Sequence, residues 1–73
     1  MTLDELRALA RRTSAAPMTI KLTDGRGLRV SHPEFLGIPQ DGQSFVYFPE
    51  TGGWQFVFLN QVVSVDSSQM EDA

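Results

Sequence analysis

The spacing of the apolar residues changes at Pro17, and this change limits the folds that the chain can adopt. Between Leu3 and Arg12 the leucines recur at every third position, which places them along one face of a helix. From Met18 to Thr23 apolar and polar residues alternate, which is the pattern of a strand with one buried face. The sequence therefore predicts one helix over about residues 3–12, followed by β-strands.

The residues that flank this helix mark its two ends. Thr2-Leu-Asp-Glu5 has the form of a capping box, in which the Thr2 hydroxyl accepts from a backbone amide and the Glu5 carboxylate reaches back to the cap. We expect Thr13–Pro17 to lead out of the helix.

The first hairpin admits two loop geometries. The apolar residues of both strands have even numbers, so they share one face only if each pair of opposite residues has numbers that add up to an even sum. A two-residue loop at Asp24-Gly25 would pair Thr23 with Arg26, an odd sum, and is excluded. A three-residue loop over positions 24–26, which pairs Leu22 with Leu28, meets this condition, and so does a bulge at Gly27.

The second hairpin, Ser44–Phe48 and Trp54–Leu59, is apolar on both faces, and a short strand, Phe35–Ile38, precedes it. One face of the hairpin is able to fill the core. The other must meet the leucines of the helix, a neighbouring chain or water. Cover by the helix and a subunit interface are equal alternatives at this point.

A last strand is expected over Val62–Asp66. One helix followed by five short strands indicates a mainly β fold, a small, strongly bent antiparallel five-stranded sheet or barrel. We expect a single domain over residues 1–66, with residues 67–73 as a flexible polar and acidic tail.

The size of the chain favours association with further copies. A domain of 73 residues buries only about 60% of its unfolded surface, so a monomer is marginally stable. The chain has no cysteine and one histidine, which excludes disulfides and a zinc–thiolate site, and we expect no metal and no cofactor. No apolar run has the length of a signal peptide or a membrane span, so a cytoplasmic protein without a membrane partner is expected.

The charges divide the chain into two parts. All six basic residues lie in the first 29 positions beside three acids, whereas the other 44 positions carry six acids and no base. The formal net charge of −3 disfavours a large phosphate-binding surface, but the basic first part leaves one face open to nucleic acid.

Two segments resemble the Sm-like family, which includes the bacterial Hfq proteins. Ile20-Lys-Leu-Thr-Asp-Gly25 followed by Leu28 is similar to the first hairpin of that family, and Gln55–Val65 is similar to its last two strands. The resemblance implies an SH3-like barrel that assembles into rings of six or seven copies by pairing the edges of its last two strands, and it implies binding of single-stranded RNA. The LTDGR segment, Leu22–Arg26, with His32-Pro-Glu34, also resembles short uncharacterised bacterial proteins.

The chain departs from the Hfq pattern at positions that matter for RNA. Phe58, Leu59 and Asn60 stand where that pattern has Tyr-Lys-His, and Val30 replaces the glycine at which the second strand bends. The connection from Val30 to Phe35 is also shorter than in Hfq. The resemblance therefore implies ring-forming architecture more firmly than RNA binding.

Two sets of candidate site residues follow. The resemblance places RNA bases at the loop before the third strand and at the final turn, and arginines on the helix are able to contact phosphates; this set comprises His32, Phe35, Asn60, Gln61, Arg7 and Arg11. The apolar second hairpin and the resemblance together point to an oligomer interface; this set comprises Tyr47, Val57, Phe58, Leu59 and Val63.

A catalytic role is not expected. His32 is the sole candidate general base, and a histidine beside Pro33 in a loop is more often a solvated turn residue, because a base needs an oriented partner. The main functional hypothesis is a non-enzymatic oligomer that binds RNA. The alternative is a protein-interaction or assembly module that binds no nucleic acid.

Overall fold

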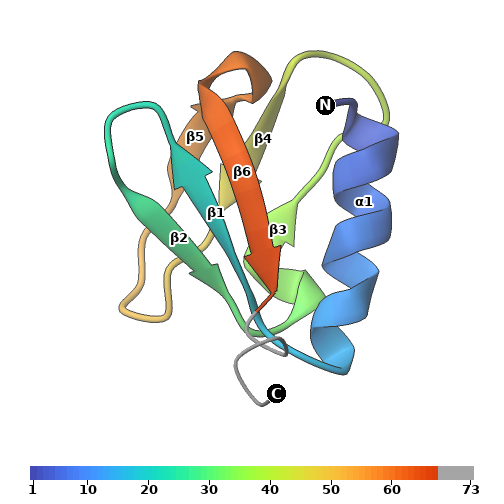
Figure 1. Cartoon of the computed structure of the whole chain (residues 1–73), viewed down its shortest axis with the longest axis vertical. Coiled ribbons are helices and arrows are strands. Elements are labelled where there is room, and N and C mark those ends of the chain that lie inside the picture. The colour runs from blue at the N-terminus through green and yellow to red at the C-terminus, as the bar shows by residue number, and fades with distance from the viewer. Residues whose placement is uncertain (68–73) are drawn as a thin grey trace.

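The computed structural model describes residues 1–67, which form one helix and six strands (Figure 1). The helix α1 spans Leu3–Arg11 and continues as a 3₁₀ turn over Arg12–Ser14. The strands are β1 (Met18–Leu22), β2 (Gly27–Val30), β3 (Leu36–Gly37), β4 (Ser44–Tyr47), β5 (Gln55–Phe58) and β6 (Val62–Ser67). Ser67 thus ends the last strand, and the rest of the predicted tail lies outside the described residues.

The strands form two separate antiparallel sheets of three, in the orders β2-β1-β6 and β3-β4-β5, and the predicted five-stranded barrel is wrong. After β2 the chain enters a 3₁₀ turn at Pro33–Phe35, and β3 beyond it is only two residues long. Proline at position 33 cannot donate to a ladder, so no continuous strand runs from one sheet into the other. The structure thus has six strands where five were stated in the prediction.

The start of α1 has the predicted capping box. The Thr2 hydroxyl accepts from the Glu5 backbone N–H at 3.1 Å, and the Glu5 carboxylate accepts from the Thr2 backbone N–H at 2.9 Å. The buried face of the helix consists of Leu3, Leu6 and Ala10. In Figure 1, α1 lies on the side of the two sheets where β3 and β6 are found, so it does not cover β5.

The first hairpin has the predicted parity but a different register. Ile20 pairs with Leu28, and the Leu22 N–H donates to the Arg26 carbonyl at 2.9 Å. The three-residue loop is therefore formed by positions 23–25, not 24–26. Gly25 ends this loop with φ +92°, a conformation that glycine adopts without strain.

The core lies between the two sheets and under α1. Its fully buried side chains come from both sheets and from the helix, namely Phe45, Leu6, Ile20 and Val30. The Tyr47 hydroxyl of the β3-β4-β5 sheet donates to the Arg29 carbonyl of β2 at 2.7 Å, which ties the sheets together across the core. Desolvation raises the Tyr47 pKa above its ordinary value of 10.0, the hydrogen bond to Arg29 opposes this shift, and the charge of Glu50 adds to it.

Candidate functional site

The outer faces of the two sheets differ in chemistry. The outward side chains of the β2-β1-β6 sheet are mostly polar or charged, and those on its central pairs are Thr19, Lys21, Arg29 and Asp66. Lys21 and Asp66 approach each other to 3.8 Å across this face. Polar and charged side chains are normally exposed to solvent, so this face gives no reason to expect a partner.

The outer face of the β3-β4-β5 sheet is aromatic. Trp54, just before β5, and Phe56 and Phe58 within it follow one another at alternate positions, and their exposed fractions are 67%, 55% and 53%. Phe48, at the end of β4, is 40% exposed. We call these four residues the aromatic face. Exposed aromatic side chains at this density mark an interaction site more often than an idle surface.

The aromatic face continues into a shallow apolar groove. Val46 pairs with Phe56 across the strands, and Ile38 and Pro39 line the other side of the groove. Gly37 leaves room for the Phe48 ring on this face of the sheet, because a Cβ atom at position 37 would lie 3.3 Å from that ring. The apolar surface therefore extends across all three strands.

Strand β5 is an edge strand whose other side pairs with no strand in the described part of the chain. The Leu59 N–H donates to the Gln43 carbonyl at 2.7 Å, and Phe45 pairs with Val57. Because hydrogen bonding alternates along an antiparallel pair, the odd-numbered residues of β5 bond to β4. The backbone N–H and C=O groups of Phe56 and Phe58 consequently point away from β4, toward the free edge.

The other long edges carry features that discourage strand pairing. Strand β6 has a register shift opposite Lys21 and Leu22 that leaves Val63 unpaired and 64% exposed, and it bears Asp66. Strand β2 bears Arg29. Bulges and charges of this kind protect sheet edges, whereas β5 has neither.

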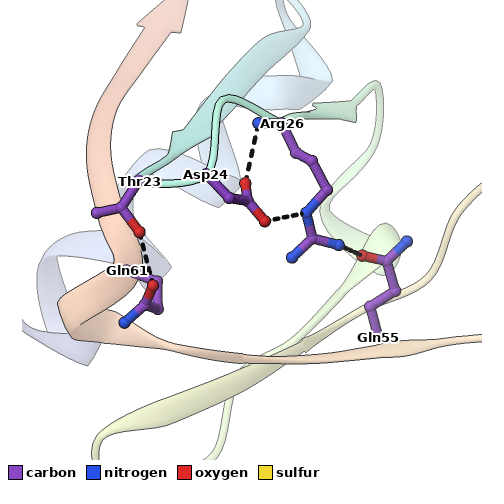
Figure 2. Close-up of polar contacts among 5 residues, drawn as sticks. All are labelled: Thr23, Asp24, Arg26, Gln55 and Gln61. Carbon is purple, nitrogen blue, oxygen red and sulfur yellow. Dashed lines mark hydrogen bonds and ion pairs between the residues drawn. The ribbon is translucent and has the colours of Figure 1, made fainter.

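A group of polar side chains holds the β1–β2 turn against β5 (Figure 2). Arg26 donates to the Asp24 carboxylate at 2.7 Å and to the Gln55 side-chain oxygen at 3.0 Å, at the start of β5. The Thr23 hydroxyl donates to the Gln61 side-chain oxygen at 2.6 Å, in the turn that follows β5. The hydrogen bond from the Arg26 backbone N–H is the largest cause that lowers the Asp24 pKa; desolvation opposes it, and the side chain and charge of Arg26 add to the lowering. Both ends of β5 are therefore anchored to the other sheet.

The residues predicted to bind RNA lie in two separate places. His32 and Phe35 stand edge to face beside the end of β2, with ring centroids 5.6 Å apart. Asn60 and Gln61 are exposed in the 3₁₀ turn after β5, where the Gln61 carbonyl accepts from the Thr23 N–H. Val30 pairs with Met18 at one end of β1, and Gln61 bonds just beyond its other end, so the two pairs are separated by about 16 Å of strand.

The two predicted arginines differ in their surroundings. Arg7 donates to the Asp4 carboxylate at 2.6 Å and to the Pro39 carbonyl at 2.7 Å, so it ties α1 to the loop after β3. Arg11 is exposed near the end of α1.

The residues predicted for the oligomer interface divide by burial. Tyr47, Val57 and Leu59 are buried within the core of this chain, whereas Phe58 and Val63 are exposed. Trp54 and Phe56 were missed by the sequence reasoning. The signal that identifies them is their alternate spacing with Phe58, which puts all three on one side of the strand.

A pocket of about 370 Å³ lies between the end of α1 and β6, lined by Leu9, Arg12, Met18 and Val65 among others. None of the candidate residues lines it. Within residues 1–67 no group of three or more His, Asp or Glu side chains is placed to hold a metal ion. No helix in this same part of the chain has the length and apolar character to cross a membrane.

No protein-family model matches this chain, and a comparison with curated protein sequences finds no match either.

Proposed function

We propose that this protein is a non-enzymatic assembly module that binds a second copy of itself through the aromatic face and the free edge of β5. The observation that carries the proposal is the row formed by Trp54, just before β5, and Phe56 and Phe58 within it, each more than half exposed, beside a strand edge that is unpaired in residues 1–67. An unpaired edge beside exposed apolar surface favours association, because strand pairing satisfies the edge backbone groups and covers the apolar surface next to the paired edge.

The uncharged, apolar character of the surface supports a second copy as its partner. With about 200 Å² for each aromatic side chain, the exposed part of the aromatic face amounts to roughly 400 Å² per copy. Two copies together expose roughly 800 Å² of aromatic surface, and pairing of their β5 edges covers the part of it where the two aromatic rows meet. The face itself carries no charge, so two copies meet without repulsion although the chain has a net charge of −3.

The proposal does not extend to a ring of six or seven copies. That expectation came from a resemblance whose barrel this chain lacks, and the last strand here has a bulge and a charge on its edge. A single interface on β5 requires only two copies.

The proposal is tested by the solution mass of two matched variants, measured by light scattering after gel filtration. Phe56→Asp places a charge in the aromatic face and should reduce the mass to that of one chain. Val63→Asp changes an equally exposed apolar residue outside that face and should leave the mass of the wild type. A monomeric wild type, or an unchanged mass in Phe56→Asp, contradicts the proposal.

Binding of single-stranded RNA is a second candidate, favoured by the edge-to-face pair of the exposed His32 and the half-buried Phe35. A base is able to stack on such rings, and Arg11 offers a cation for phosphate. Titration of short single-stranded RNAs at two salt concentrations tests it. Binding should weaken as salt rises and should be lost in His32→Ala, whereas absence of binding at low salt contradicts this candidate.

A further inference from the structure

We infer that the two copies pair β5 with β5 across a two-fold axis that passes beside Phe56, in a register that sets Trp54 of each copy opposite Phe58 of the other. This inference rests on the proposed self-association and adds its symmetry and register.

Strand pairing at this edge is restricted by the direction of the backbone groups. Only the even-numbered residues of β5 direct N–H and C=O groups toward the free edge, as the bond from Leu59 to Gln43 requires. A second β5 strand has the same property. In an antiparallel pair of two such strands, an even-numbered residue must therefore face an even-numbered residue.

Among the registers that this rule allows, one uses the whole aromatic row. When Phe56 faces Phe56, Trp54 of each copy faces Phe58 of the other, and all three exposed aromatics form cross-strand pairs. When Phe56 instead faces Phe58, Trp54 falls opposite Asn60 in the 3₁₀ turn and has no aromatic partner. When Phe58 faces Phe58, both Trp54 residues lie beyond the overlap.

The inferred pair joins two three-stranded sheets into one of six strands. The order becomes β3-β4-β5 followed by β5-β4-β3 of the second copy, with the aromatic faces of both copies on the same side. Because each copy contributes the same surface, the interface is closed and leaves no free β5 edge for a third copy. Growth into a fibre through this edge is excluded by the same symmetry.

The absence of cysteine from the chain makes disulfide trapping a direct test. In the inferred register, Phe56→Cys places two thiols on residues that face each other, with Cα atoms about 5.5 Å apart, within the range of a disulfide. Phe58→Cys is the matched control, because Phe58 is exposed to nearly the same extent. Its two copies lie four residues apart along the strands, about 13 Å, which no disulfide spans.

Each variant is oxidised at a concentration where the wild type is associated, and its products are resolved on a non-reducing gel and by mass spectrometry. We expect Phe56→Cys to become a covalent dimer as its main product, and the double variant Trp54→Cys/Phe58→Cys to do the same. Phe58→Cys alone should remain uncrosslinked. Circular dichroism confirms that each variant is folded.

The outcomes separate this inference from the proposal beneath it. Trapping by Phe58→Cys but not by Phe56→Cys overturns the register. An associated wild type with no trapping at either position overturns β5–β5 pairing and leaves self-association in place. A monomeric wild type overturns both.

Discussion

Phe56 and Phe58 stand edge to face on the outer side of β5, with ring centroids 5.4 Å apart and ring planes at 88°. Neighbours two apart on a strand point to the same face, and this arrangement of the rings is one that aromatic pairs prefer. More than half of each side chain is nevertheless exposed. Phe56 and Phe58 thus hold each other in place while they remain open to a partner, and binding then costs less side-chain freedom.

Self-association predicts that the melting temperature depends on protein concentration. Because a partner that binds only the folded state adds to its stability by mass action, the wild type should melt at lower temperature on dilution. Phe56→Asp should show the same melting temperature at every concentration. Scanning calorimetry over a dilution series measures this, and a concentration-independent wild type would argue against a folded dimer.

The helix is predicted to be essential for the core although it is short. Leu6 is fully buried, and Leu6→Ala should cost about 2–5 kcal/mol through lost apolar contact and a cavity. A domain of this size rarely has more than about 3–5 kcal/mol in total, so the variant should be largely unfolded at 25 °C. Ala8→Ser, at an exposed position of the same helix, should change the unfolding free energy by less than about 0.5 kcal/mol. Urea unfolding followed by circular dichroism compares the two variants.

The capping box predicts a smaller loss from the end of the same helix. Thr2→Ala removes the oxygen that accepts from the Glu5 N–H and should cost about 1 kcal/mol in the unfolding free energy. Thr2→Ser keeps this oxygen and should retain most of the stability. If the alanine and serine variants unfold at the same urea concentration, the cap does not contribute as described.

The environment of Tyr47 predicts a loss of stability at alkaline pH. Desolvation raises the Tyr47 pKa above 10.0, so the folded chain keeps the phenol proton at a pH where the unfolded chain has released it. The contribution of the protonated Tyr47 phenol to the unfolding free energy is therefore complete below pH 10. It is lost as the pH rises through the pKa that Tyr47 has in the folded chain. Tyr47→Phe should lose about 1 kcal/mol at pH 8, because the hydrogen bond to the Arg29 carbonyl is absent.

Melting temperatures measured from pH 8 to pH 11 test this prediction for wild type and Tyr47→Phe. The gap between the two proteins should narrow above pH 10, since only the wild type carries the phenol. A gap that stays constant over this range would mean that Tyr47 does not titrate differently in the folded state.

Local structure was largely predictable from the sequence, because it depends on neighbouring residues. The cap at Thr2 and Glu5 follows from their spacing, and the parity of the first hairpin follows from the need to bury Ile20 and Leu28 together. The register predicted for that hairpin was wrong by two positions, because Leu28 pairs with Ile20 and not with Leu22. Parity alone does not decide where in a three-residue loop Gly25 sits, and the structure places it last, with positive φ.

The sheet arrangement and the aromatic face were less predictable, because both depend on distant contacts. The sequence analysis placed Pro33 in a loop, but closure of the sheet depends on whether β2 and β3 form one bent strand across that loop, and in the structure they do not. On a strand that is apolar on both faces, hydrophobicity does not distinguish the inner Val57 from the outer Phe56. Which face is left exposed is decided by how the two sheets pack on each other, because Val57 lies in the core between them and α1 does not cover the opposite face of β5.

Hydrogen exchange at the free edge of β5 is the most direct test of the central claim. The backbone amides of Phe56 and Phe58 point away from β4, so in a single copy they exchange rapidly, and in a paired copy they are hydrogen-bonded. We predict that exchange at these two amides, followed by NMR, slows as the protein concentration rises, while the amide of Val57 stays protected throughout. Exchange at Phe56 and Phe58 that is equally rapid at every concentration, in a range where the solution mass exceeds that of one chain, would contradict the account.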